Sequence, residues 1–148
     1  MSVEHGHSLT SEHEALRATL KRAMREPGRT GDAARRLAGV ADGHFLREEK
    51  FVLPLLAMLP ALARGESGAQ LALAEKLLQG LKSGMEQMIT DHRVMAELLR
   101  ELARAAEAED KPDYVAFAEE LILHAHAEEE VLYPAALVAG AYVKLLRS

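Results

Sequence analysis

Four histidines of this chain fall on apolar stripes of α-helical period, and two of them are followed one turn later by a glutamate. The stripes begin at Leu9, Leu37, Met85 and Phe117. The polar residues on them are His13, His44, Glu48, His92, His124 and Glu128. Imidazole and carboxylate groups gathered inside an apolar core are typical of a metal site.

The spacing within each histidine–glutamate pair favours ligation of one ion by both side chains. His44 precedes Glu48 by four residues, as His124 precedes Glu128. On an α-helix this spacing separates two side chains by roughly 40° in direction and about 6 Å in height. An ionised group buried without a partner costs several kcal/mol, whereas a whole domain has only about 5–15 kcal/mol of stability. We therefore expect two divalent ions, with the glutamates bridging and two histidines on each ion.

The absence of cysteine limits the metals that the chain can bind. It excludes disulfides, iron–sulfur clusters and thiolate zinc sites, so the ligands must be imidazole and carboxylate groups. Such a set is well suited to iron and also accepts zinc or manganese. The residues therefore predict two divalent ions, with iron favoured and zinc or manganese as possible substitutes.

The elements that position these residues are predicted to be helices throughout. Ala, Leu, Glu and Arg dominate, and no stretch alternates apolar and polar residues as a half-buried strand does. Proline and glycine clusters divide the chain into helices near 9–26, 32–63, 69–109 and 113–146. The third could bend or break at Gly80 and Gly84, which would leave residues 69–84 as an extra arm. The predicted fold class is all-α, an up-down four-helix bundle.

The second half of the chain repeats the first. Ser11-Glu12-His13 corresponds to Thr90-Asp91-His92, and residues 44–49 correspond to residues 124–129. The separation between the two histidines of each half agrees to within one residue, and a proline follows each glutamate by six residues. The bundle should consist of two repeated helix pairs related by a pseudo-twofold axis.

Length and charge narrow the class of protein further. The 148 residues fit a single domain, of which residues 1–8 are expected to be flexible. The net charge of −5 argues against a general nucleic-acid binder, which needs a basic surface to neutralise phosphates. The chain start lacks the basic and apolar segments of a secretory signal, so we expect a cytoplasmic protein.

Two apolar stretches of the chain are long enough to bear on membrane or partner contacts. Phe51 to Ala63 and Val131 to Val143 are both shorter than the ~20 residues that span a bilayer, and both contain proline. We therefore expect no membrane contact. The apolar turns from Leu137 to Leu146 favour a homodimer.

Taken together, these residues resemble the hemerythrin-like, or HHE cation-binding, domains. The resemblance runs from Ser11 to Pro134. Its marks are Glu12-His13-Glu14-Ala15-Leu16-Arg17, His44-Phe45-Leu46-Arg47-Glu48-Glu49, Asp91-His92, and His124 leading through Glu128-Glu129-Glu130-Val131-Leu132-Tyr133 to Pro134. The resemblance implies the same six ligands that the helical stripes select, around an iron pair completed by an oxo or hydroxo bridge.

The chain departs from the oxygen-carrying hemerythrins in its third helix. Those proteins supply two histidines four residues apart, whereas here Ala96 follows His92 at that spacing and Met88 precedes it. The chain therefore looks more like family members implicated in responses to oxygen, nitric oxide or peroxide. Both irons are expected to keep an exchangeable position.

Three functions remain open from the sequence. The first is a non-haem di-iron protein that binds O₂, NO or peroxide. Any turnover would be weak peroxidase-like or catalase-like activity or slow oxidation, because no Ser–His pair or phosphate loop offers other chemistry. The second is a sensor or iron-handling module without turnover. The third is an inert bundle whose histidines are merely hydrogen-bonded.

Several other polar residues lie near the predicted ligands in sequence but are not expected to be ligands. Glu49 and Glu129 could orient the ligands or could be solvated charges. His126 should point away from the site, and His5 and His7 lie in the expected flexible start.

Overall fold

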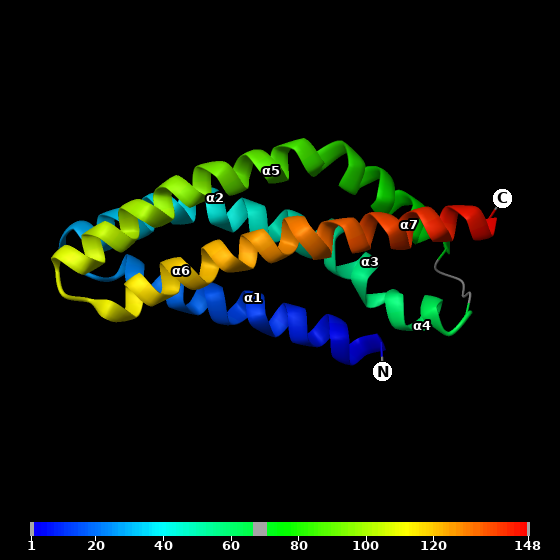
Figure 1. The fold of residues 1–148 in the computed structure, drawn as a ribbon, viewed down its shortest axis with the longest axis horizontal. Helices are drawn as coiled ribbons and strands as arrows, with labels where there is room; N and C mark the ends of the chain where they lie inside the picture. Colours follow the sequence, from blue (N-terminus) through cyan, green and yellow to red (C-terminus); the bar gives the residue numbers. More distant parts are fainter. Residues whose placement is uncertain (1, 67–70, 148) are drawn as a thin grey trace.

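The computed structural model describes residues 2–66 and 71–147, with side chains from residue 9 onward (Figure 1). Every regular element in these ranges is a helix. In chain order they are α1 (Ser2–Met24), α2 (Gly28–Phe51), α3 (Leu53–Ala57), α4 (Leu59–Ala63), α5 (Leu71–Ala108), α6 (Pro112–Ala127), the π-helix η1 (Glu128–Leu132) and α7 (Tyr133–Arg147). The prediction of an all-α bundle is confirmed.

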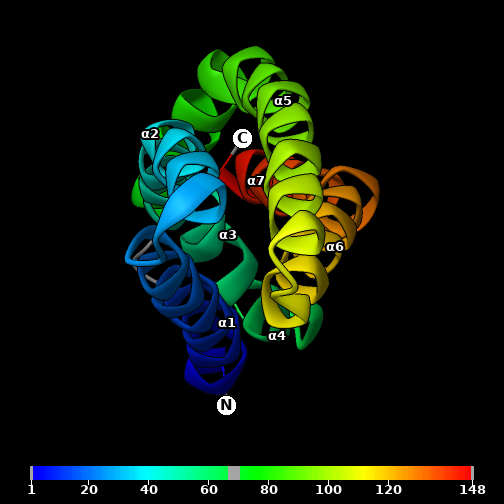
Figure 2. The ribbon, with the colours of Figure 1, turned by 90° about the vertical axis from the view of Figure 1, so that its left-hand side faces the viewer.

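Four long helical segments run alongside one another and enclose one interior. α1 packs on α2, α2 on α5, and α5 on both α6 and α7. α6, η1 and α7 follow one another as a single rod along the length of the molecule in Figure 1. In the end-on view of Figure 2, α1, α2, α5 and α6 surround the interior. The bundle thus consists of two helix pairs.

Prolines explain why two predicted helices are not single α-helices. Pro54 has no N–H to donate to the carbonyl one turn before it, so the helix predicted over 32–63 ends at Phe51 and continues as α3. The N–H of Val52 still donates to the carbonyl of Glu48 at 2.8 Å, and α3 then turns away from the direction of α2 (Figure 1). In the second half, Pro134 follows η1 in the same relation to its glutamate. The helix predicted over 32–63 is therefore divided into α2, α3 and α4, whereas the helix predicted over 113–146 continues through α6, η1 and α7 with a change of helical type.

The remaining boundaries differ less from the prediction. α1 begins at Ser2 instead of residue 9. The flexibility expected for residues 1–8 stays a prediction. The side chains of His5 and His7 lie outside the described side chains. α5 continues without a break from Leu71 through Gly80 and Gly84, so the predicted separate arm does not form in the described part of that segment. Gly80 lets a neighbour approach, since a Cβ there would lie 2.2 Å from the Phe51 ring. None of the helices in the described ranges is long and apolar enough to cross a membrane.

The core consists of two apolar clusters with one polar layer between them. The first cluster lies toward the α1–α2 and α5–α6 turns and includes Leu20, Leu37 and Leu102. The second lies toward α3 and α7 and includes Leu55 and Leu81. The predicted ligand residues occupy the helical turns between these clusters. Apolar packing on both sides keeps water from this polar layer, so its groups need partners within it.

The N-terminus of α2 is capped from the other helix pair. Glu109, just after α5, accepts hydrogen bonds from the backbone N–H of Arg29 at 3.0 Å, and from the N–H and hydroxyl of Thr30 at 2.9 and 2.5 Å. Gly28 makes this possible, because its φ is +75° and a Cβ there would lie 2.3 Å from a Glu109 oxygen. The cap joins α2 to the end of α5 and so fixes the relative position of the two helices that carry three of the predicted ligands.

Candidate metal centre

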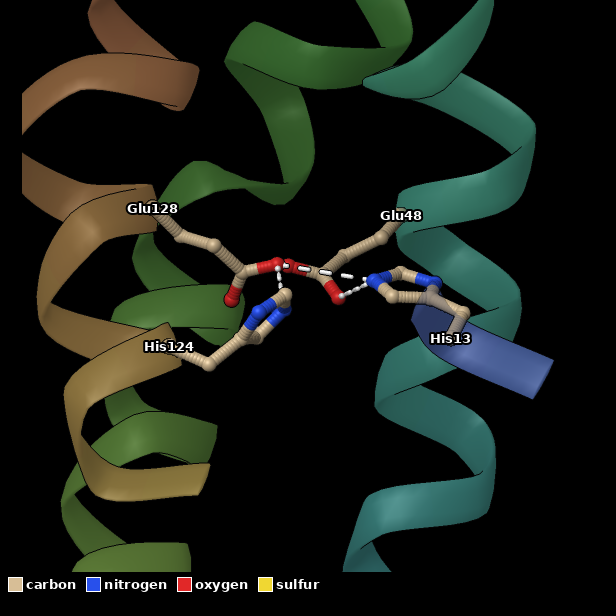
Figure 3. Close-up of side chains that lie close together, drawn as sticks. All are labelled: His13, Glu48, His124 and Glu128. Atoms are coloured by element: carbon tan, nitrogen blue, oxygen red, sulfur yellow. Dashed lines mark hydrogen bonds and ion pairs between the residues drawn. The ribbon is translucent and has the colours of Figure 1, made fainter. Parts of the chain in front are cut away.

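The six predicted ligand residues lie together at one level of the bundle. They come from four different helices and the π-helix: His13 on α1, His44 and Glu48 on α2, His92 on α5, His124 on α6 and Glu128 on η1. Five of them are at most 5% exposed, and the side chain of His124 is 7% exposed. Figure 3 shows four of the six, with the carboxylates of Glu48 and Glu128 meeting between the rings of His13 and His124.

These residues form two groups that share both glutamates. In each group, one nitrogen or oxygen per residue lies within 4.8 Å of the others. We call them the outer position, formed by His13 and His124 with the two glutamates, and the inner position, formed by His44 and His92 with the same glutamates. Each position takes one histidine from each half of the chain. This is the arrangement predicted for an ion pair, whereas ligation itself stays a prediction.

The four glutamate oxygens are divided between the two positions. Oε1 of Glu48 lies 3.3 Å from Nε2 of His13, and Oε2 of the same carboxylate lies 3.3 Å from Nε2 of His44. Oε1 of Glu128 lies 3.0 Å from Nε2 of His92, while its Oε2 faces the outer position. Each carboxylate therefore presents one oxygen to each position, as a bridging ligand does.

Two carboxylates orient histidines of the opposite half. Asp91 lies 3.1 Å from Nδ1 of His44, and Glu12 lies 2.6 Å from Nδ1 of His124. Both acids immediately precede a ligand histidine in sequence, yet each supports a histidine from the other half. A hydrogen bond from Nδ1–H to a carboxylate directs Nε2 toward the centre, as is usual for histidines that bind metals.

Glu49 and Glu129, whose roles the sequence left open, behave differently. Glu129 accepts a hydrogen bond from Nδ1 of His92 at 2.9 Å. Glu49 instead forms an ion pair with Arg17, and Nδ1 of His13 has no hydrogen-bond partner among the described residues. A carboxylate thus contacts Nδ1 in three of the four histidines, but not in His13 on α1.

The second half carries Ala96 where the first half has Arg17. Ala96 therefore neither draws Glu129 away from His92 nor fills the space beside that ring. A cleft of about 140 Å³ lies at this place between α5 and α6. Its walls run from the exposed His126 to buried Met95, with His92 among them. The exposure of His126 agrees with the expectation that it points away from the metal positions.

The charges of the buried groups are balanced through protons. Burial lowers the pKa of His44, but hydrogen bonds to Glu128 and Glu48 outweigh it and raise this pKa to about 10. Burial likewise lowers the pKa of His124, and the hydrogen bond to Glu128 raises it to about 9. Burial and the adjacent Glu128 raise the pKa of Glu48. Protonated His44 and His124 therefore balance the negative charge of the glutamates, and divalent cations could replace these protons.

Tyr133 also belongs to this centre, although the helical pattern did not select it. Its hydroxyl donates to Oε2 of Glu48 at 2.5 Å and lies 3.1 Å from Nε2 of His92. Its ring stacks on that of His92 with centroids 5.5 Å apart, and the residue is 2% exposed. Burial, followed by the charges of the two glutamates, raises the pKa of this phenol far above its ordinary value.

The π-helix explains how Tyr133 reaches the site. Residues five apart on an α-helix differ by roughly 140° in direction, which would point Tyr133 away from Glu128. In η1 the backbone N–H of Tyr133 bonds to the carbonyl of Glu128, five residues earlier instead of four, and this wider turn brings both side chains to the interior. Pro134, which cannot donate to the carbonyl four residues earlier, is the one local signal for this wider turn.

The hydrogen-bonding of the buried groups fits a metal centre better than a hydrogen-bonded polar core. Oε1 of Glu48 is buried without a hydrogen-bond partner among the described residues, as is Nδ1 of His13. Nε2 of His44 and Nε2 of His92 lie 2.9 Å apart, close to the spacing of about 3 Å between two adjacent ligands of one ion. All donors are nitrogen or oxygen, which suits iron, zinc and manganese.

Comparison with known proteins agrees with this geometry. Residues 6–136 match the family model of the hemerythrin HHE cation binding domain, a segment that contains all six predicted ligands. No curated protein and no solved structure matched the chain. The match covers most of the sequence, and the chain therefore belongs to the hemerythrin HHE cation-binding domain family.

Proposed function

We propose that this chain is a non-haem di-iron protein that binds O₂, NO or peroxide at an iron pair inside the bundle. The observation that carries this proposal is the pair of four-residue groups that share both glutamates. The ligands would be the six residues that the sequence selected: His13, His44, Glu48, His92, His124 and Glu128.

The donor set supports iron and a small exogenous ligand. Each position offers two imidazole nitrogens and two carboxylate oxygens, fewer donors than an octahedral ion accepts. Iron, when bound, supplies one-electron redox chemistry and open positions for a ligand of two or three atoms. Zinc or manganese fits the same donors without the same redox chemistry.

The surroundings also favour a ligand of few atoms. The cleft beside Ala96 has a volume of about 140 Å³, and buried Met95 and Leu99 form its apolar side. A cleft of this volume excludes bulky substrates. Glu129 holds the proton on Nδ1 of His92 at the edge of this cleft, so the ring stays oriented when a ligand enters.

A sensor or iron-handling module without turnover is the second candidate. α7 follows the ligand Glu128 through the short helix η1 and exposes apolar side chains, with Val138 66% and Leu145 73% exposed. A change of metal state that moves Glu128 would displace η1 and therefore the start of α7. Rapid peroxide decomposition by the iron-loaded protein would decide against this candidate.

The test of the leading proposal is metal analysis of freshly purified protein, with absorption spectra recorded before and after dithionite and again after air. We expect about two irons per chain and ferric charge-transfer bands that bleach on reduction and return in air. His44→Ala should lose metal, whereas His126→Ala, at an exposed histidine on the same helix as His124, should retain it. Absence of metal, or one zinc whose removal leaves thermal stability unchanged, contradicts the proposal.

A further inference from the structure

Tyr133 is the one polar side chain of the inner position that no ligand prediction covered. We propose that its hydroxyl oxygen is a fifth protein ligand of the inner position, and that the outer position has no counterpart. This inference rests on the proposed metal binding and adds to it a residue and an inequality between the two ions.

The distances around the hydroxyl are those of a ligand. It lies 2.5 Å from Oε2 of Glu48, 3.1 Å from Nε2 of His92, 3.3 Å from Nε2 of His44 and 3.4 Å from Oε1 of Glu128. Adjacent ligands around one ion, each at about 2.1 Å from it, are about 3 Å apart. The tyrosine oxygen therefore sits among the four donor atoms of the inner position at the spacing that these donors have from one another.

The contacts are also specific to one side of the centre. The two glutamate oxygens that Tyr133 approaches are the ones that face His44 and His92, not the ones that face the outer position. A tyrosine that served only to hydrogen-bond a bridging carboxylate would need one such contact, whereas this hydroxyl reaches all four donors of the same group.

The backbone fixes the hydroxyl in this place. The five-residue turn of η1 puts Tyr133 on the same face as Glu128, and stacking on His92 at an interplanar angle of 16° limits rotation of the ring. A buried phenol with these restraints loses little further freedom when it binds a cation.

The first half of the chain has no equivalent group. Leu53 stands five residues after Glu48, as Tyr133 stands five residues after Glu128. A leucine offers no donor atom, and η1 is the only π-helix in the ranges that the structure describes. The repeat therefore supplies matching histidines and carboxylates to both positions but a phenol to one alone, so the inner ion should be held more tightly.

Spectroscopy separates ligation from a hydrogen bond, because only a bound phenolate gives tyrosine-to-ferric charge transfer in the visible region. Binding releases the phenol proton to solvent. Metal-depleted protein would be loaded anaerobically with ferrous ammonium sulfate, oxidised in air, and examined by absorption and by resonance Raman spectroscopy excited within the visible band. We expect tyrosine ring modes in the wild type.

The variant Tyr133→Phe should lose both the band and the ring modes. It should also make the two positions equal: in a timed competition with a chelator, the wild type should lose its two irons in two steps, and the variant should lose both in the earlier step. The matched control is Tyr142→Phe, at a tyrosine on α7 that is 42% exposed, and it should behave as the wild type.

The outcomes distinguish this inference from the proposed function. Two irons per chain without tyrosine modes, and with Tyr133→Phe unchanged, would overturn the inference and leave the di-iron proposal standing. Failure of the wild type to bind iron would overturn both. If Tyr133→Phe does not fold by circular dichroism, ring-deuterated tyrosine in the wild type still decides, because the Raman modes must shift on labelling if a tyrosine is bound.

Discussion

Nδ1 of His92 lies 2.9 Å from Oε2 of Glu129, whereas Nδ1 of His13, the equivalent atom in the first half, has no partner among the described residues. The difference follows from Arg17, which holds the equivalent acid, Glu49. The second half of the repeat thus contains a histidine whose Nδ1 is oriented by a carboxylate, and the first half contains the matched histidine without one.

Glu129→Gln and Glu49→Gln form a matched pair that tests this difference. Glu129→Gln should weaken metal binding by about 10- to 100-fold, because a neutral amide holds the Nδ1 proton of His92 less firmly. Glu49→Gln should leave the affinity unchanged, because Glu49 pairs with Arg17 instead of with a ligand. Competition of each variant with a chromogenic chelator for Zn²⁺ measures its metal affinity. Equal losses in the two variants would contradict the assignment.

Glu48→Gln should reduce the metal content at both positions together. Its carboxylate presents one oxygen to His13 and the other to His44, and an amide nitrogen cannot replace either oxygen as a ligand. We expect the iron content to fall from about two per chain to below one, while His13→Ala, which removes a ligand of the outer position only, should leave about one. Elemental analysis of the purified variants gives these values. Retention of two irons by Glu48→Gln would exclude a bridging role.

Metal binding should release protons and strengthen as pH rises. The pKa of His44 is raised to about 10 and that of His124 to about 9, so both rings are protonated at neutral pH and must lose a proton to bind a cation. Below these pKa values, each unit by which the pH rises therefore favours the metal-bound form. Titration with Zn²⁺ in weakly buffered solution should release about two protons per chain from these rings. An affinity that does not change between about pH 6 and pH 8 would count against ligation by these histidines.

Glu109→Gln should lower the thermal midpoint of the protein, whether metal is bound or not. The hydrogen bonds from Thr30 and Arg29 lower the pKa of Glu109 to about 2. Because this value lies below the ordinary one, the ionised cap stabilises the fold above about pH 4.5 and is lost as pH falls toward about 2. The wild type should therefore lose more stability over that window than the variant. Glu107→Gln, at an exposed position in the last turn of α5, is the control and should show neither effect.

Ala96→Leu should slow the binding of small ligands without changing the iron content. The larger side chain would occupy the cleft of about 140 Å³ beside His92, while every predicted ligand stays in place. Stopped-flow measurement of NO or azide binding to the iron-loaded protein tests this. Ala108→Leu, at an exposed position near the end of α5, serves as the control for an added leucine. Unchanged association rates would show that ligands reach the irons by another route.

The sequence predicted the part of the centre that follows α-helical periodicity. His13 and His92 interrupt regular apolar stripes, and Glu48 and Glu128 each lie one α-helical turn after a histidine, so the interior face of each helix could be deduced from local spacing. The cytoplasmic location and the homodimer stay predictions.

The rest depends on non-local contacts or on departures from the α-helix. Tyr133 was missed because the turn before it has the π-helical period, which spacing arguments do not anticipate. The roles of Glu12 and Asp91 were missed because each supports a histidine on another helix pair. No pattern within a single helix indicates such a partner.

Each metal position takes one histidine from each half of the chain, so a bound ion would act as a cross-link between segments that are far apart in sequence. Such a link closes long loops and restricts the unfolded chain, much as a disulfide does. In this cysteine-free protein the cross-link would resist reductants and would open instead to acid and to chelators. Iron supply and pH, rather than thiol redox state, would then control how easily the two halves separate.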